Sequence, residues 1–201
     1  VAIRTIQLHQ GKAIYGVGGG ITWDSTWESE YREVHQKAAV LYRKQARFQL
    51  ITTGKISQKK LLFEEQHLER LRKASRYFAY PFDPEILRQK IEAECQTCDD
   101  NQDYRLRISL GKSGEIELSR QILTPLSPHF CQAKLCLQES DLQQAFTYFK
   151  TTHRPHLSLG EQEKIYHNVK GELLETSIGN LVLKIAGKLY TPPVRLEILP
   201  G

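Results

Sequence analysis

The helix that organises this sequence is predicted over residues 64–77, Glu64-Glu65-Gln66-His67-Leu68-Glu69-Arg70-Leu71-Arg72-Lys73-Ala74-Ser75-Arg76-Tyr77. Its side chains at Leu68, Leu71, Ser75 and Phe78 recur at intervals of three or four residues. This spacing places them on one face of an α-helix, so that face is expected to pack on a core.

Strand signals lie on both sides of this helix. We predict two strands before it, over residues 48–53 and 61–63. Pro84 suits the first turn of a second helix, which we expect to extend to about Cys95. Two further strands are predicted over 104–110 and 115–122, as a hairpin. The order strand, strand, helix, helix, strand, strand is that of an α+β unit.

The N-terminal residues form a separate block. Strands are expected over 2–9 and 12–15, followed by a helix over 28–42. Ser25 is the predicted N-cap, with Glu28 three residues on as in a capping box. The glycines at 16–20 match neither of the two phosphate-binding patterns, G-x-x-x-x-G-K-[ST] and G-x-G-x-x-G before a helix. We therefore expect them to form a positive-φ turn or to allow a close approach of the backbone.

After a proline-containing linker comes a third block. Strands are predicted over 134–138 and 165–167, and residues 146–150 are expected to lead into a loop. A hairpin is expected from strands 181–185 and 188–190 around Ala186-Gly187.

Four segments follow from these blocks. They are an N-terminal segment 1–43, a small α+β domain 44–124, a linker 125–131 and a second domain 132–201. The absence of an initial Met and the Leu199-Pro200-Gly201 end lead us to expect a piece of a longer chain, with its last domain truncated.

The composition narrows the class of protein. The net charge is +5, but the basic residues are interspersed with acidic ones, which is typical of a solvated surface. We therefore expect no nucleic-acid partner, and a mildly basic chain suits an anionic small substrate. The sequence has neither an apolar run of membrane-spanning length nor a signal peptide, so we expect no membrane association and a cytoplasmic location.

The four cysteines lie at Cys95, Cys98, Cys131 and Cys136. A zinc site usually requires two closely spaced pairs, and the second pair here has four intervening residues in a predicted strand. Alternation along a strand would point those two side chains to opposite faces. We therefore favour ordinary reduced thiols over zinc ligands.

Several charged side chains are candidates for a site, each with a plain surface alternative. Glu30 and Glu33 on the first helix could bind Mg²⁺, although a solvated helix face is the commoner interpretation. Arg105 and Arg107 point to one face of a strand, where they could hold a carboxylate or phosphate or simply face water. Arg70 by itself is an ordinary surface arginine.

The most unusual carboxylate is Glu175, which lies between the apolar runs 173–174 and 181–183. A carboxylate in apolar surroundings needs a cationic partner. The following Thr, Ser, Gly and Asn residues, up to Asn180, offer hydroxyls and N–H groups that suit a phosphate, or else form a simple turn between strands.

Residues 1–43 resemble the C-terminal end of chorismate-utilising enzymes, in particular aminodeoxychorismate synthase component one. The residues that carry this resemblance are Ala2-Ile3-Arg4-Thr5, Gly18-Gly19-Gly20-Ile21, Asp24-Ser25, Glu30, Glu33 and Lys37. In that family the glycine segment lines the chorismate pocket and a glutamate of the next helix binds Mg²⁺. Glu30 or Glu33 would inherit that role only in an intact domain. Trp27 stands where the family usually has proline.

Residues 44–201 resemble class IV aminotransferases and, within them, aminodeoxychorismate lyase. Four motifs occur in the family's order: His67-Leu68-Glu69-Arg70-Leu71, Lys150-Thr151-Thr152, Glu175-x-Ser177-x-x-Asn180, and Thr191-Pro192-Pro193 with Leu199-Pro200-Gly201. The stretch between Arg154 and Glu175 is shorter than usual. Some bacteria fuse the two families represented here, which catalyse consecutive steps of 4-aminobenzoate synthesis.

This resemblance implies a two-domain pyridoxal-phosphate enzyme of fold type IV, α+β or α/β in class, preceded by a strand-helix remnant of a chorismate-binding domain. Lys150 would carry the cofactor, Arg70 would bind its phosphate, and Glu175 would face its pyridine nitrogen, with Ser177 and Asn180 also at the cofactor.

The implied reaction converts 4-amino-4-deoxychorismate to 4-aminobenzoate and pyruvate in folate biosynthesis. Lys150 would remove the C4 proton, and Thr53 would assist near the substrate. A homodimer, and a glutamine amidotransferase subunit for the full-length protein, are the implied partners. The alternatives are a class IV amino-acid aminotransferase and a non-catalytic truncated domain.

Overall fold

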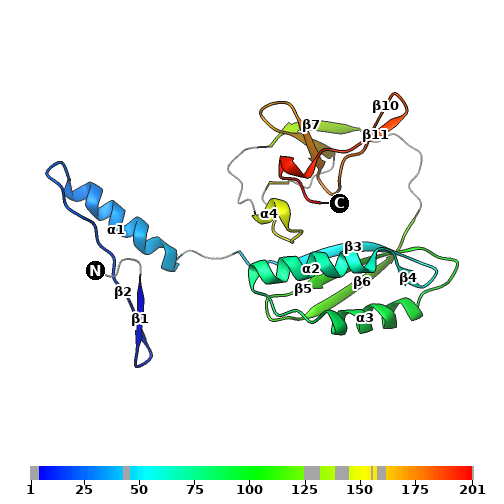
Figure 1. Cartoon of the computed structure of the whole chain (residues 1–201), viewed down its shortest axis with the longest axis horizontal. Helices are drawn as coiled ribbons and strands as arrows, with labels where there is room; N and C mark the ends of the chain where they lie inside the picture. The colour runs from blue at the N-terminus through cyan, green and yellow to red at the C-terminus, as the bar shows by residue number, and fades with distance from the viewer. Residues whose placement is uncertain are drawn as a thin grey trace. The chain divides into compact units, whose positions relative to one another are not determined.

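The computed structural model describes residues 5–42, 46–124, 132–138, 145–154, 156–157 and 162–200 (Figure 1). The chain divides into two compact units, residues 1–46 and 47–201. The predicted linker 125–131 lies outside the described residues. In the described part of the chain, no helix is long and apolar enough to span a bilayer.

The first unit is a hairpin followed by a helix. Strands β1 (Ile6–His9) and β2 (Lys12–Tyr15) pair antiparallel, and α1 spans Trp27–Tyr42. The expected cap at Ser25 is wrong: the Oγ1 of Thr26 accepts the backbone N–H of Ser29 at 3.3 Å. A hydroxyl directly before the helix is closer to the free N–H groups of its first turn. None of the side chains of α1 is buried within this unit.

The glycine run lies against α1. A Cβ at Gly19 would come 2.7 Å from Oε2 of Glu30, and Nζ of Lys37 donates to the carbonyl O of Gly18 at 2.8 Å. The close approach predicted for this run is therefore confirmed. The alternative of a positive φ is wrong, because φ of the described glycines is positive only at Gly11, Gly114, Gly171 and Gly187.

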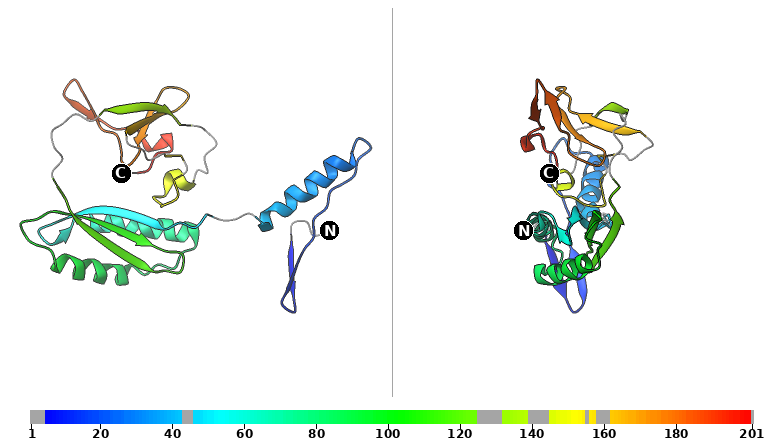
Figure 2. Two further views of the ribbon diagram at one scale, coloured as in Figure 1. Left: turned by 180° about the vertical axis from the view of Figure 1, so that it is seen from behind. Right: turned by 90° about the vertical axis from the view of Figure 1, so that its right-hand side faces the viewer.

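The second unit begins with a four-stranded antiparallel sheet of order β4-β3-β5-β6. Its strands are β3 (Leu50–Ser57), β4 (Lys60–Leu61), β5 (Tyr104–Leu110) and β6 (Ile116–Ile122). Two helices, α2 (Glu64–Phe78) and α3 (Pro84–Gln96), pack on one face of it (Figure 2). This confirms the strand-strand-helix-helix-strand-strand order expected from the sequence.

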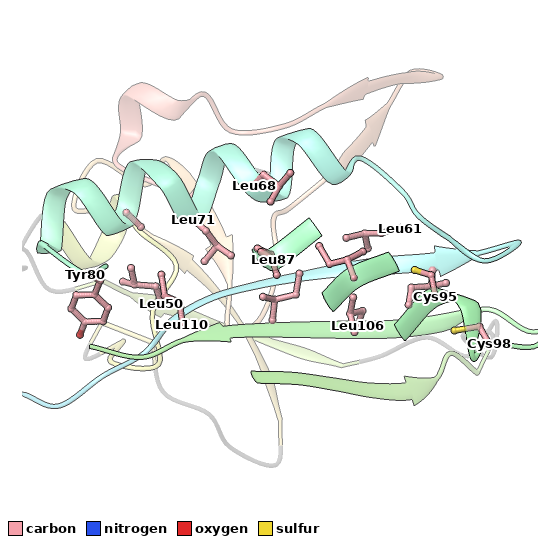
Figure 3. Close-up of a cluster of buried hydrophobic side chains, with 14 residues drawn as sticks. Leu50, Leu61, Leu68, Leu71, Tyr80, Leu87, Cys95, Cys98, Leu106 and Leu110 are labelled. Atoms are coloured by element: carbon pink, nitrogen blue, oxygen red, sulfur yellow. The ribbon is translucent and has the colours of Figure 1, made fainter. Parts of the chain in front are cut away.

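The core of this layer lies between the two helices and the sheet. Leu68 and Leu71 point from α2 towards the strands, as predicted from their spacing (Figure 3). Leu106 and Leu110 on β5 are fully buried. Cys95 and Cys98 are free thiols buried in the same core, and burial raises the pKa of Cys95 to about 11.

Capping explains why α3 begins where it does. Asp83 accepts the backbone N–H of Glu85 at 2.9 Å through Oδ1, and Pro84 occupies the first helical position. Proline is well placed there because its missing N–H would have no partner within the helix.

A second sheet, of order β7-β8-β9, is formed by β7 (Ala133–Leu137), β8 (Glu163–His167) and β9 (Leu173–Thr176). The hairpin β10 (Leu183–Ile185) and β11 (Lys188–Tyr190) and a 3-10 turn at Val194–Leu196 follow. Buried Leu157, Tyr166, Leu174 and Ile198 make the core of this layer.

One local expectation for this layer is wrong. Residues 146–150 do not lead directly into a loop, because a short helix, α4, spans Ala145–Tyr148. Glu175 lies in strand β9, and a turn follows it, in which the backbone N–H of Thr176 donates to the carbonyl O of Gly179 at 2.8 Å. The simple turn that the sequence offered as one alternative for the residues after Glu175 is therefore confirmed.

Candidate active site

Lys150 is held in place by the first sheet. Its carbonyl O accepts the backbone N–H of Ile51 at 2.9 Å, and the N–H of Thr152 donates to the carbonyl O of Gln49 at 2.9 Å. The backbone N–H of Gln49 donates in turn to Oγ1 of Thr152 at 2.9 Å, and Thr151 is fully buried. The lysine segment thus pairs like a short strand with the start of β3, a rigid element.

The amine of Lys150 has an unusual electrostatic environment. Burial is the largest of the effects that lower its pKa to about 8; the positive charges of Arg70, Arg154 and Arg107 contribute to this shift, while Glu175 opposes it. An ordinary lysine has a pKa near 10.4, so this amine is neutral far more often near neutral pH. A neutral amine is the nucleophilic form needed for reaction with an aldehyde.

Arg70 reaches the site from α2. Its Nη2 donates to the carbonyl O of Pro200 at 2.6 Å, which ties α2 to the C-terminal segment. His67, one turn earlier, is 2.8 Å from Oγ1 of Thr52 through Nδ1. A Cβ at Gly54 would lie 2.5 Å from Nε2 of His67, so only glycine leaves room for this ring.

The surroundings of His67 favour the neutral form of its ring. Burial lowers its pKa, and the positive charges of Arg70 and Lys150 lower it further. His67 is the first residue of the motif at 67–71, but the resemblance implied no function for it. Thr52 and Gly54, which hold its ring, were not singled out in the sequence; their signal is the small side chains at alternate positions of a strand that faces a helix.

Glu175 lies opposite these cations on β9. It is 2% exposed, and its Oε2 is 3.4 Å from Nη2 of Arg154. Burial raises the pKa of Glu175, whereas Arg154, a hydrogen bond from the Leu199 backbone and Lys150 all act to lower it. Lys150, Arg70 and Glu175, which are far apart in the sequence, therefore meet at one place.

Ser177 and Asn180 lie beside Glu175 but are engaged in structural bonds. Oγ of Ser177 accepts the backbone N–H of Lys164 at 3.2 Å, and Nδ2 of Asn180 donates to the carbonyl O of Leu199 at 2.7 Å. These bonds join β8, β9 and the C-terminal segment. The cofactor-binding role of Ser177 and Asn180 stays a prediction.

Thr53 is half-buried on β3 and pairs with Arg107 of β5 in the strand register. Arg105 and Arg107 alternate on the same strand face, as expected, but Arg105 donates to Oε1 of Gln121 at 2.6 Å. Arg107, by contrast, is one of the charges that act on Lys150. The register thus links Thr53 to the group around Lys150 through Arg107.

Two further polar side chains were missed in the sequence. Nε of Arg154 and both ring nitrogens of His156 are buried with no hydrogen-bond partner in the structure, His156 being 8% exposed. Burial lowers the pKa of His156 to about 4, with Arg154 and His153 adding to the effect. Their only signal was proximity to Lys150 in the sequence.

The predicted Mg²⁺ ligands belong to the first unit. Oε1 of Glu30 accepts the hydroxyl of Ser25 at 2.7 Å, and Glu33 forms an ion pair with Lys37. Among the described residues, no group of three or more His, Cys, Asp or Glu side chains is placed to hold a metal ion.

The residues around Lys150 fit pyridoxal phosphate. Four basic side chains, of Lys150, Arg70, Arg107 and Arg154, act in one region, and Glu175 is the carboxylate that acts on Lys150 there among the residues that the structure describes. Such an excess of positive charge, partly buried, suits a phosphate. The amine with lowered pKa suits an aldehyde.

The fold is the mixed α and β fold of pyridoxal-phosphate enzymes of fold type IV. The family model for amino-transferase class IV matches residues 49–201, and the chain belongs to this family. Residues 1–43 match the model for chorismate binding enzymes. No curated protein matches the chain significantly.

Solved structures share this fold. A provisionally designated amino-acid aminotransferase from Mesorhizobium loti is 25% identical, with a TM-score of 0.62 over 77% of this chain and 79% of that one. A provisionally designated 4-amino-4-deoxychorismate lyase from Legionella pneumophila is 21% identical, with a TM-score of 0.58 over 76% of this chain and 65% of that one.

A hypothetical aminotransferase from Mycobacterium tuberculosis, in a form with pyridoxal phosphate bound, is 18% identical. Its TM-score is 0.60 over 76% of this chain and 64% of that one. This chain therefore spans a little under two thirds of the lengths of the Legionella and Mycobacterium proteins.

Proposed function

We propose that this chain binds pyridoxal phosphate through Lys150 and acts as a 4-amino-4-deoxychorismate lyase, releasing 4-aminobenzoate and pyruvate for folate biosynthesis. The observation that carries the proposal is the meeting of a half-buried amine of lowered pKa, Lys150, with Arg70 and Glu175. Each of these residues comes from a different segment of the chain, and each belongs to a motif of the lyase resemblance.

Each residue has a distinct role in this proposal. Bound pyridoxal phosphate supplies an electron sink for the pair released when a bond at the substrate carbon breaks. Arg70 binds the phosphate with the N–H groups that do not serve Pro200. Glu175 supplies the buried carboxylate that holds the ring nitrogen in its protonated form.

Nζ of Lys150 is the proposed base for the C4 proton of the substrate. A pKa of about 8 is suitable for this task, because a base works best when its pKa lies near the ambient pH. Loss of that proton and of pyruvate leaves the ring aromatic. Thr53 is proposed to assist with the substrate, and its pairing with Arg107 across β3 and β5 supports this role.

The lyase is favoured over an amino-acid aminotransferase by residues 1–43. A chorismate-binding segment joined to this family fits a fused enzyme for consecutive steps on one substrate. The aminotransferase remains the second candidate, supported by the 25% identical Mesorhizobium protein. A third candidate is a domain that binds no cofactor and serves only for association.

The proposed location of the protein is the cytoplasm.

Self-association into a homodimer is supported by apolar side chains exposed on the β10–β11 hairpin, where Leu189 is 71% and Ile185 57% exposed. A glutamine amidotransferase subunit, and Mg²⁺ at Glu30 or Glu33, are proposed for the full-length protein only. Light scattering on the purified chain tests the dimer.

Borohydride reduction after addition of pyridoxal phosphate tests the central claim. Reduction should attach the cofactor irreversibly to Lys150, as found by peptide mass spectrometry, and Lys150→Ala should abolish the label. Lys73→Ala, at an exposed lysine of α2 beside Glu69, is the matched control and should label normally. Labelling of Lys150→Ala at the wild-type level would overturn the proposal.

A product assay then separates the two enzymes. Incubation with 4-amino-4-deoxychorismate should yield 4-aminobenzoate and pyruvate in equal amounts. Amino-group transfer from an amino acid to a keto acid, without 4-aminobenzoate formation, would instead establish the aminotransferase.

A further inference from the structure

Arg154 is attached to the same rigid segment as Lys150. The backbone bonds of 150–152 to β3 fix this segment, and the hydroxyl of Thr151 donates to the carbonyl O of His153 at 2.6 Å, which closes the turn before Arg154. The guanidinium is therefore presented from the first sheet. Its partner, Glu175, comes from β9 in the second sheet.

The contact between the two side chains is buried and loose. The side chains alone are 17% exposed for Arg154 and 3% for Glu175, and Nη2 is 3.4 Å from Oε2. Charge-assisted hydrogen bonds are usually about 2.7–2.9 Å long. Since arginine stays protonated in proteins, the charge of Arg154 must be balanced by Glu175 or by a bound anion.

Unpartnered polar atoms gather at the same place. Three of the four buried side-chain polar atoms without a hydrogen bond, among the described residues, are Nε of Arg154 and the two ring nitrogens of His156. Native proteins leave few such atoms, and each one calls for an explanation. The long contact between Arg154 and Glu175, with nitrogen atoms beside it that have no hydrogen-bond partner, is suited to adjust when a group binds.

We propose that Arg154 is a positioning residue that holds the Glu175 carboxylate ionised and oriented at the cofactor site. It acts through Glu175 and does not itself take part in the reaction. The proposal rests on the proposed function only for the identity of the bound cofactor, because the Arg154–Glu175 pair is present in the chain alone.

Removal of the Arg154 charge has a consequence for Glu175 without any cofactor. A buried carboxylate that loses its cation takes up a proton, so Arg154→Met should give a protonated Glu175 near neutral pH. Infrared spectroscopy should then show a carboxylic acid band that is absent from wild type and disappears in Arg154→Met with Glu175→Gln. Arg154→Lys keeps the charge and should not show the band.

The stability of the same variants has a definite pH dependence. The pKa of Glu175 is already raised by burial in the wild-type fold and should rise further in folded Arg154→Met, so the variant keeps the extra proton up to a higher pH. The free energy of unfolding should therefore fall with rising pH over a wider range above about 4.3, the ordinary glutamate pKa, in Arg154→Met than in wild type. Glu175→Gln in the same background should remove this slope.

Cofactor binding provides the second readout. Arg154→Met should weaken binding of pyridoxal phosphate by about tenfold, which corresponds to a change of one unit in the pKa of Glu175. Borohydride reduction should still attach the cofactor to Lys150 in this variant. Arg154→Lys should retain most of the affinity.

The two proposals fail in different ways. If wild type is never labelled at Lys150, the proposed function fails, yet the infrared band and the pH slope still test Arg154. If wild type is labelled and Arg154→Met shows neither the band nor a wider pH range of the slope than wild type, the role of Arg154 is refuted.

Discussion

The backbone N–H of Ile51 donates to the carbonyl O of Lys150 at 2.9 Å. Through this bond, the first sheet fixes the lysine, although Glu175 belongs to the second sheet. The candidate site is thus assembled where two layers of the 47–201 unit meet. A substitution in either layer should therefore change the environment of the Lys150 amine.

The rate at which Lys150 reacts with pyridoxal phosphate should rise with pH, with a midpoint near its pKa of about 8. Only the neutral amine reacts, so the rate follows its fraction. Arg107→Leu removes one of the cations that lower this pKa, and should move the midpoint upwards. Arg105→Leu is the control, because Arg105 is engaged with Gln121. Equal midpoints for the two variants would contradict this electrostatic account.

Arg70→Ala should weaken binding of pyridoxal phosphate but not of pyridoxal, which lacks the phosphate. A charge-assisted hydrogen bond contributes roughly 1.5–3 kcal/mol, so we expect a loss of about 10–100-fold for the phosphate form. Arg72→Ala, which breaks only a surface pair with Glu69, should bind both forms normally. Fluorescence titration measures both affinities, and an equal loss for the two ligands would exclude phosphate recognition by Arg70.

Gly54→Ala should destabilise the 47–201 unit. The new methyl group would lie 2.5 Å from Nε2 of His67 and 2.7 Å from Cδ1 of Leu61, both in a packed region. Overpacking of this kind costs about 1–3 kcal/mol, measurable by urea unfolding. Gly16→Ala, where the structure has no atom within 4 Å, is the control.

The steric explanation for Gly54 can be tested separately. His67→Ser in the Gly54→Ala background should add less destabilisation than it does alone, because the two changes share one contact. Additive losses would show that the ring of His67 is not what excludes a side chain at position 54.

His156→Phe should make the protein less sensitive to acid. The folded pKa of His156 is about 4, below the ordinary value of roughly 6.5, so the folded state binds fewer protons in this range. The contribution of the neutral His156 ring to the free energy of unfolding is therefore fully present above about pH 6.5, and it is lost as the pH falls towards 4. The phenylalanine ring has no nitrogen to protonate or to leave unpartnered.

His156→Phe should accordingly unfold at a lower pH than wild type. At the acid end of the range, its free energy of unfolding should exceed that of wild type by roughly 1–3 kcal/mol. His9→Phe, on the exposed β1–β2 hairpin, should leave the acid transition of the 47–201 unit unchanged. An acid transition that does not move in His156→Phe would mean that this ring is not held neutral by burial.

Local sequence patterns were sufficient for the elements of the first layer. The helix predicted over 64–77 is α2, Glu64–Phe78, and the strand predicted over 104–110 is β5. Each of these has a strong period and clear end signals, such as the proline at the start of α3. The sequence also determined the family, because motifs around Arg70, Lys150 and Glu175 occur in a fixed order.

Only the tertiary structure decided how the site is built. The pairing of Lys150 with Ile51, the packing of His67 over Gly54 and the approach of Arg154 to Glu175 all join residues from different elements. Side-chain charge and burial at these points depend on which segments come together. The separation in sequence is 13 positions for Gly54 and His67, 21 for Arg154 and Glu175, and 99 for Ile51 and Lys150. A linear pattern with a period of two or 3.6 residues holds no record of such distances, so the sequence could name Lys150 but not the neighbours that lower its pKa.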